Sequence, residues 1–182
     1  MKFTDKMGVM KGQFRVRVEN VNSGKSWIHY EDLNTIVLIA KRDVVRLIGN
    51  DNITQRYISK MKFGDGGHVS DPLDPNFGQA LPTNENMTNL VALILTKTIS
   101  SITFDDNLIA NTSSATFESI IDTSEGNGPS GTQIYSEAGL FTFNETLVNG
   151  LIPTSGLFAI KNFPILTKTP ELRFVFDWTI VI

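Results

Sequence analysis

Leu172-Arg-Phe-Val-Phe-Asp-Trp-Thr-Ile-Val-Ile182 is the stretch that decides the fold. Its large apolar residues recur at every second position, which is the period of a half-buried β-strand. Each of them contributes roughly 1.5–3 kcal/mol when fully buried, so we expect this strand to belong to the core and its deletion to destabilise the fold. The apolar face carries Leu172, Phe174, Phe176, Trp178, Ile180 and Ile182, and the other face carries Arg173, Asp177 and Thr179.

Further strands are predicted wherever apolar and polar residues alternate between Gly, Pro, Asn and Ser turns. In 13–20, for example, Phe14, Val16 and Val18 alternate with charged residues. This spacing is typical of a mainly β protein, and we predict an antiparallel, jelly-roll-like β-sandwich with one packed helix. The predicted strands are 13–20, 26–30, 57–63, 115–121, 134–143, 157–163 with Pro164 at its edge or end, and 171–182, and the stretch 90–104 is also rich in strand formers.

One helix is expected over about 34–48, where apolar residues fall near helical spacing. Asp32 or Asn34 can cap its first turn, and Gly49 can end it. Its polar face is basic, with Lys41, Arg42 and Arg46. A nucleic-acid site needs more charge and interleaved aromatic residues, so we interpret this face as solvated, or else as one side of a subunit salt bridge.

A loop rich in Pro and Asn is predicted over 68–89, between Gly64-Asp-Gly-Gly67 and the next strand-forming stretch. Loops of this length in compact domains are usually functional or partner-bound, so this loop is the best candidate for an arm that becomes ordered in an assembly. We expect one domain over 1–182, in which 1–30 forms an N-terminal hairpin or arm.

The composition excludes several classes of function. Of 182 residues, 41% are hydrophobic and 19% charged, which is enough apolar material for a core, and the net charge of -3 gives no general attraction to nucleic acid or anionic membrane. There is no cysteine, so thiolate sites and disulfides are absent. No apolar stretch resembles a secretory signal or a membrane span, so we expect a soluble protein made in the cytoplasm.

Two features of the loop and of the turn before it could indicate a ligand-binding site. Asp65, His68, Asp71 and Asp74 are oxygen and nitrogen donors in a flexible segment that calcium would accept, but the spacing differs from that of an EF-hand. Residues 64–67 suggest a phosphate-binding loop, but a Pro-rich segment follows where a helix is required. In both cases the turn-forming reading is stronger, because Asp and Gly populate turns for backbone reasons.

Enzymatic chemistry has no recognisable signature in this chain. Gly-x-Ser-x-Gly is missing, and His29 and His68 lie in unrelated segments. Glu137 invites a fixed salt bridge or interface contact, but we favour a strand residue that faces solvent. We therefore predict no enzyme activity and assign no catalytic, cofactor-binding or metal-binding residue. The carboxylates available for acid–base work are Asp105, Asp106, Glu118, Asp122, Glu125 and Glu137.

Four blocks of the chain together resemble a group of small virion proteins of tailed bacteriophages, found in tails, baseplates and fibres. They run in the same order over most of the chain from Asn34 onward. The blocks are Asn34-Thr-Ile-Val37 with Lys41-Arg-Asp-Val-Val-Arg-Leu-Ile-Gly49, Ile58-Ser-Lys-Met-Lys-Phe-Gly-Asp-Gly-Gly67, Ala115-Thr-Phe-Glu118 with Gly126 and Ile134-Tyr-Ser-Glu-Ala-Gly-Leu-Phe141, and Leu157-Phe-Ala-Ile-Lys-Asn-Phe-Pro-Ile-Leu-Thr-Lys-Thr169 with Leu172-Arg-Phe-Val-Phe-Asp-Trp-Thr-Ile180.

The resemblance implies a repeated structural building block of the virion, with copies of itself and other virion proteins as partners and with no catalytic residues. A ring or other oligomer in the tail, baseplate or collar is the first expectation, and a capsid decoration protein is the second. A host-glycan-binding module is a third hypothesis, because β-sandwiches carry such sites on their loops. Its aromatic candidates are Trp27, Tyr30, Tyr57, Tyr135 and Trp178, the last of which is expected in the core.

Overall fold

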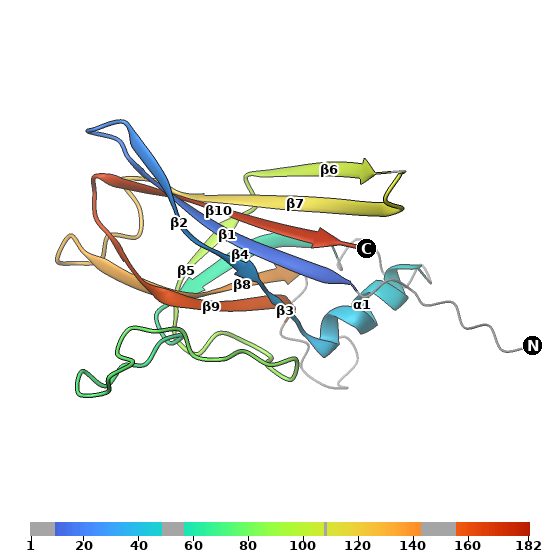
Figure 1. The fold of residues 1–182 in the computed structure, drawn as a ribbon, viewed down its shortest axis with the longest axis horizontal. Coiled ribbons are helices and arrows are strands. Elements are labelled where there is room, and N and C mark those ends of the chain that lie inside the picture. The colour runs from blue at the N-terminus through green and yellow to red at the C-terminus, as the bar shows by residue number, and fades with distance from the viewer. Residues whose placement is uncertain (1–9, 49–56, 108, 143–155) are drawn as a thin grey trace, which may run out of the picture.

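Two antiparallel sheets of five strands face each other in the computed structural model, which describes residues 10–48, 57–107, 109–142 and 156–182 (Figure 1). This arrangement confirms the predicted mainly β, sandwich-like architecture with one short helix. The elements are β1 (Lys11–Asn20), β2 (Lys25–Leu33), β3 (Thr35–Ile36), α1 (Leu38–Ile48), β4 (Ile58–Gly64), β5 (Leu93–Thr98), β6 (Ser101–Asn107), β7 (Thr112–Ile121), β8 (Gln133–Thr142), β9 (Leu157–Lys168) and β10 (Leu172–Val181).

The first sheet has the strand order β2-β1-β10-β7-β6, and the second has the order β3-β9-β8-β4-β5. The chain therefore crosses from one sheet to the other after β2, β5, β7 and β9. β10 lies in the centre of the first sheet, where it pairs antiparallel with β1 and with β7. In keeping with this central position, every residue of β10 from Phe174 to Trp178 is buried.

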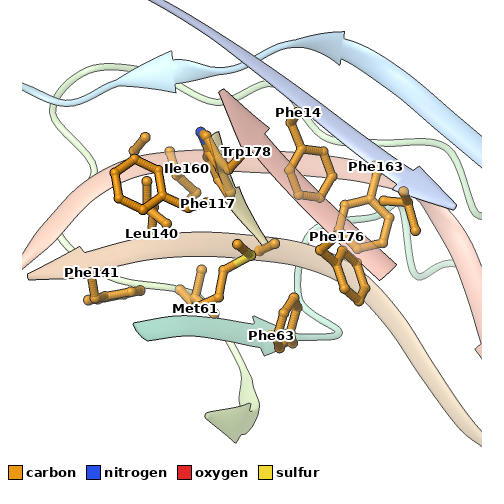
Figure 2. Close-up of a cluster of buried hydrophobic side chains, with 14 of the residues drawn as sticks. Phe14, Met61, Phe63, Phe117, Leu140, Phe141, Ile160, Phe163, Phe176 and Trp178 are labelled. Carbon is orange, nitrogen blue, oxygen red and sulfur yellow. The ribbon is translucent and has the colours of Figure 1, made fainter. Parts of the chain in front are cut away.

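The apolar face of β10 forms the middle of the core, as predicted. Phe174, Phe176 and Trp178 are fully buried. Aromatic rings from both sheets meet in the space between the sheets (Figure 2). Phe176 and Phe63 of β4 have centroids 4.4 Å apart, and Phe14 of β1 lies 5.6 Å from Phe163 of β9. Ile182 departs from the prediction, because it follows the last strand residue and is 59% exposed.

The helix is shorter than predicted. The helix was expected from about Asn34, but Thr35 and Ile36 form the short strand β3, which pairs with Ala159 and Ile160 of β9, and the helix begins at Leu38. Asp32 does not cap the helix, because its carboxylate accepts the N–H of Leu33 and the ammonium of Lys161. The expected end at Gly49 lies outside the described residues. Within the described part of the chain, no helix is long and apolar enough to cross a membrane.

Two other predicted strand limits are corrected. The stretch 90–104 is not one element, because β5 lies in the second sheet and β6 in the first. The strand predicted to stop near Pro164 runs on to Lys168. β3 pairs with β9 only at Ala159 and Ile160, so Pro164 lies on a free edge of the sheet. A proline is tolerated there because it has no backbone N–H to donate, which agrees with the prediction of Pro164 at an edge or end of this strand.

Residues 65–92 connect β4 to β5 and contain turns and one isolated bridge, His68 with Ala80. This segment runs along the side of the second sheet that faces away from the first (Figure 1). It also reaches the beginning of α1, where Leu38 donates its N–H to the carbonyl of Glu85 and the hydroxyls of Thr35 and Thr83 lie 2.6 Å apart. Part of the outer face of the second sheet is therefore covered by the chain itself.

Candidate functional site

Glu137 holds both ends of the segment 65–92. Its side chain is fully buried on β8, and its carboxylate accepts three backbone N–H groups. Oε1 accepts from Gly66 at 3.2 Å and from Ala92 at 2.7 Å, and Oε2 accepts from Val91 at 2.9 Å. The prediction that Glu137 faces solvent is therefore wrong. Hydrogen bonds to a charged acceptor are about twice as strong as neutral ones, so this carboxylate binds both ends of the segment 65–92 strongly to β8.

The Gly-rich turn after β4 is shaped by the approach to this carboxylate. A Cβ added to Gly64 would lie 2.4 Å from Oε1 of Glu137 and 2.2 Å from the carbonyl oxygen of Ala92. At Gly67 it would meet the carbonyl of Ser136 at 2.3 Å. Glycine is needed here because no side chain fits between the turn and β8. The turn therefore receives a carboxylate of its own chain where the phosphate-loop reading placed a ligand.

Ser136 and His68 form a second attachment beside Glu137. The Ser136 hydroxyl lies 2.8 Å from Nδ1 of His68 and accepts the N–H of Gly67 at 3.0 Å. A serine and a histidine at this distance can form a nucleophile–base pair. Ser136 is fully buried between neighbouring strands, so a substrate has no access to its oxygen. The pair acts as a structural hydrogen bond that fixes the start of the loop.

The middle of the loop is fastened to β9. Asn162 donates from Nδ2 to the carbonyl of Leu81 at 3.2 Å, and Ile165 donates its N–H to the carbonyl of Gly78 at 3.0 Å. Gly78 has φ +79°, a conformation that favours glycine. With the attachments at Glu137 and Ser136, these bonds order the loop within one chain. Leu73 nevertheless points outward, since it is 91% exposed, and Phe77 is 49% exposed.

The proposed calcium donors do not converge. The carboxylates of Asp71 and Asp74 each accept the backbone N–H two residues later, from Leu73 at 2.9 Å and from Asn76 at 2.7 Å. These are the self-bonded turns that the alternative reading expected. Among the described residues, no group of three or more His, Asp or Glu side chains is placed to hold a metal ion.

The remaining carboxylates lie in two separate places. Asp106 and Glu118, on β6 and β7, accept the hydroxyls of Ser113 and Ser101 on the outside of the first sheet. Asp122 and Glu125 lie in the turn after β7. The pKa of Glu125 is lowered because its carboxylate accepts the Lys97 ammonium, and the pKa of Asp122 is lowered mainly by the N–H of Thr123.

Lys168 closes the same turn from β9. Its side chain is fully buried, and its ammonium donates to Oδ1 of Asn127 at 2.8 Å and to the carbonyl of Thr169 at 2.9 Å. Burial lowers the pKa of this ammonium. All these contacts tie the turn to the neighbouring strand, and they describe a structural corner of the sandwich.

The five aromatic candidates for a glycan platform do not gather. Trp178 is buried, as expected, and Tyr135 is also fully buried, which removes it from any surface. The ring of Tyr30 lies beneath the ammonium of Lys161, 5.5 Å from its centroid. Trp27 and Tyr57 are exposed, on β2 and just before β4. On the basic face of α1, Lys41 forms an ion pair with Glu85 at 3.3 Å. The side chains of Arg42 and Arg46 lie outside the described part of the structure.

The helix α1 lies at the end of the sandwich where β1 begins and β10 ends (Figure 1). An apolar pocket opens beside this helix. Its volume is about 680 Å³. Asn34 lies in its wall, and neither Oδ1 nor Nδ2 of this side chain has a hydrogen-bond partner. The other residues that line it are Met10, Lys11, Gly12, Leu33, Ile36, Lys41, Val44, Val45, Ile48 and Ile182.

A second apolar pocket, of about 300 Å³, shares Val44 and Ile182 with the first and continues toward Phe104 of β6 and Phe117 of β7. We call the two pockets and their rim the open end. Large apolar side chains crowd its rim, where Phe104 is 74% exposed and Val45 66% exposed. The other exposed apolar residues of the open end are Leu33, Ile48, Tyr57 and Ile182.

Sequence reasoning missed both the Glu137 clamp, by which we mean the Glu137 carboxylate with the N–H groups of Gly66, Val91 and Ala92, and the open end. The reasons differ. A glutamate within an apolar strand, in Tyr135-Ser-Glu-Ala-Gly-Leu-Phe141, was the available signal for a buried, bonded carboxylate. The three glycines at 64, 66 and 67 were its counterpart. The open end had no such signal, because an apolar residue facing a core and one facing a pocket look alike in a sequence.

Comparison with protein-family models, with curated proteins and with solved structures finds no match for this chain. The resemblance to tailed-phage structural proteins therefore stays a prediction.

Proposed function

We propose that this chain is a structural protein of a tailed bacteriophage virion, which assembles as a ring or other oligomer in the tail, baseplate or collar. The observation that carries the proposal is the open end. Monomeric soluble proteins rarely leave a contiguous apolar patch of large side chains uncovered, and such patches mark interfaces. In a virion protein the natural cover is another copy of the chain or a neighbouring virion protein.

The edge strand β6 supports the same proposal. All seven of its residues are exposed, including Ile102 and Phe104, and within the first sheet it pairs only with β7. An uncovered edge strand presents free backbone donors and acceptors to another chain. Assembly removes this liability by covering the edge.

The loop 68–89 supports an assembly role in a second way. Its attachments to Glu137, Ser136 and Asn162 hold it in one conformation, while Leu73 and Phe77 face outward. A contact surface that is already ordered loses less conformational entropy on binding. We include in the proposal that this extended loop contacts a neighbouring subunit, and that the strand connections are jelly-roll-like.

The test of this function is to purify the particles that contain the chain and to trace it in their cryo-EM density. We expect the chain in every particle, localised to the virion after synthesis in the host cytoplasm, with its open end covered. A chain that is absent from purified particles by mass spectrometry, and stays monomeric at high concentration, contradicts the proposal.

A capsid decoration protein is the alternative within the same class, since a cement protein also covers apolar surface when it binds. Copy number distinguishes the two roles. A tail or baseplate ring contains roughly six to twelve copies per particle, whereas decoration requires hundreds. Quantitative mass spectrometry against the major capsid protein measures the ratio directly.

A further inference from the structure

We propose that two copies of this chain pair edge to edge through β6, in antiparallel direction, so that their first sheets join into one continuous sheet. The inference deepens the proposed function and rests on it, because both require copies of the chain to meet. It names the partner of β6, which is the β6 strand of a second copy, and the register in which the two strands meet. Three features of the strand lead to it.

The first feature is that β6 is the least protected edge of the two described sheets, whose edge strands are β2, β6, β3 and β5. Proteins protect exposed edges with bulges, charged residues, proline or very short strands. β2 carries Lys, Glu and Asp and meets β1 with a shift of register, β5 meets β4 with another shift, and β3 has only two residues. β6 pairs with β7 without any shift, and it contains neither lysine, arginine nor proline.

The second feature is that β6 extends beyond the cover of the second sheet. Ile102 and Phe104 lie opposite Phe117 and Ala115 of β7, and opposite residues share a face. Phe117 is buried in the core, whereas Ile102 is 44% exposed and Phe104 is 74% exposed. The nearby strand of the second sheet, β5, packs against β7. The inner face of β6 is therefore apolar and uncovered, and β6 with β7 forms the upper rim of the sandwich in Figure 1.

The third feature is the charge pattern of β6, which selects the antiparallel direction. Asp105 and Asp106 stand toward the end of the strand, and Ser101 is its first residue. Two strands paired in parallel and in register have their carboxylates side by side, and like charges directly opposite each other are destabilising. Antiparallel strands set each acidic end beside the uncharged beginning of the other. This arrangement has two-fold symmetry, so both copies use the same surface and the pair is closed.

The side chains of β6 also select one register. The free backbone groups of an edge strand lie on alternate residues, so a hydrogen-bonded partner residue lies on the same face of the sheet. With Thr103 on the two-fold axis, Phe104 of each copy lies opposite the partner's Ile102. In the same register Asp105 lies opposite the partner's Ser101, whose hydroxyl can donate to the carboxylate. Apolar residues therefore meet apolar residues on the inner face, and polar residues meet polar residues on the outer face.

This register also continues a row of threonines across the outer face of the first sheet. Thr179 of β10 lies opposite Thr116 of β7, and Thr116 lies opposite Thr103 of β6. The hydroxyls of Thr116 and Thr179 are 2.8 Å apart. The row ends at the free edge in one copy, and the partner's Thr103 extends it. An axis one residue later breaks the row and sets Asp106 opposite the partner's Ile102.

Cysteine cross-linking tests the pairing, because the chain has no cysteine. Opposite residues of antiparallel strands have Cα atoms about 4.5–5.5 Å apart, a distance that a disulfide spans. Thr103 is exposed, and we expect Thr103→Cys to form a disulfide-linked dimer under mild oxidation. We also expect Ser101→Cys in one tagged copy to link to Asp105→Cys in a co-expressed copy with a different tag.

Ser26→Cys is the matched control, because Ser26 is also exposed on an edge strand of the first sheet, namely β2. This variant should remain unlinked. Absence of a Thr103→Cys dimer, or equal linking of the control, overturns the proposal. Preferential linking of Ser101→Cys to itself indicates parallel strands and also overturns it.

Hydrogen exchange on the wild-type chain gives an independent readout. Pairing occupies the outward N–H groups of β6, so we expect their exchange to slow by at least about tenfold from a dilute to a concentrated sample. Thr103→Lys places two like charges at the axis and should remove this dependence on concentration, whereas Ser26→Lys should retain it. Exchange of β6 in the wild-type chain that is the same at all concentrations overturns the proposal.

Failure of the proposed function is distinguishable from failure of this inference. A chain that forms the Thr103→Cys dimer but is absent from purified virions retains the pairing and rejects only the virion role. A chain that is present in virions, with its β6 edge against a different protein, retains the virion role and rejects the pairing.

Discussion

At the scale of single residues, Glu137 is the side chain on which the long loop most depends. It brings a carboxylate into the interior, where three backbone N–H groups from both ends of the loop surround it. A buried charge is costly unless it is fully hydrogen-bonded, and this arrangement supplies the required donors. The same contacts close a loop of more than 20 residues, and they offset the conformational entropy that the chain loses when the ends of this loop meet.

Replacement of the Glu137 carboxylate should therefore destabilise the folded protein. In Glu137→Gln the amide nitrogen presents hydrogens to a backbone N–H, so at least one donor is left unpaired, and we expect a loss of about 2–4 kcal/mol in unfolding free energy. Urea unfolding measures the loss, and amide hydrogen exchange should report faster exchange at Gly66, Val91 and Ala92. Glu171→Gln, on an exposed turn, is the matched control and should change stability by less than about 0.5 kcal/mol. Equal losses of unfolding free energy in the two variants would contradict this role of Glu137.

Tyr135 makes a second residue-scale prediction. Burial, assisted by the carboxylates of Asp65 and Glu125, raises its pKa to about 12, while an unfolded tyrosine titrates near 10. The folded state thus favours the neutral phenol. This contribution is complete below pH 10 and is lost as the pH rises from about 10 to about 12, by roughly 3 kcal/mol in total.

The substitution Tyr135→Phe isolates this effect. It removes the hydrogen bond from the phenol to the carbonyl of Gly126, so at pH 8 we expect a stability lower than the wild type by about 1 kcal/mol. The difference should shrink and then reverse above pH 10, because only the wild type has a buried phenol to ionise. Urea unfolding at a series of pH values measures it. A difference that stays constant from pH 8 to pH 11.5 contradicts the assignment.

At the scale of elements, β10 combines the central core with the open end. Ile180 and Ile182 stand on the same face two residues apart, but Ile180 is 7% exposed and Ile182 is 59% exposed. We expect Ile180→Ala to destabilise the fold by about 2–5 kcal/mol and Ile182→Ala by less than about 0.5 kcal/mol in a monomeric sample. Thermal or urea unfolding of the two variants gives the comparison directly. Similar losses would contradict the description of the end of this strand.

The elements that the sequence predicted well are those whose burial follows a simple period. β1 buries Phe14, Val16 and Val18 on one face, and β10 buries its aromatic residues in the same manner. The elements that were wrong depend on pairing partners far away in sequence. Thr35 and Ile36 form a strand because β9 lies beside them, and the stretch 90–104 divides because β4 and β7 draw its halves to different sheets.

The site follows the same division. Turn chemistry is local, so the self-bonded turns at Asp71 and Asp74 were predictable. The role of Glu137 was not, because its partners Val91 and Ala92 are 46 and 45 residues away. The burial of Tyr135 also depends on a distant ring, that of Phe63.

At the scale of the whole molecule, the two ends of the sandwich differ in character. One end is closed by the turn after β7, where Glu125 pairs with Lys97 and Asp122 pairs with Arg173, and where Lys168 donates a hydrogen bond to Asn127. The other is the open end, where α1 leaves an apolar pocket and β6 extends with all its side chains exposed. This asymmetry supports the proposal of a building block that would associate through its open end and carry the loop 68–89 along its side.

Association through the open end is the central claim, and sedimentation velocity over a range of protein concentrations tests it most directly. The account predicts oligomers for the wild type and for Val21→Lys, which places the new charge on the turn between β1 and β2, and smaller species for Val45→Lys, which places it in the pocket wall. All three should show the same β-sheet circular dichroism. A wild-type chain that stays monomeric at every concentration, or a Val45→Lys variant that associates as strongly as the wild type, would contradict the claim.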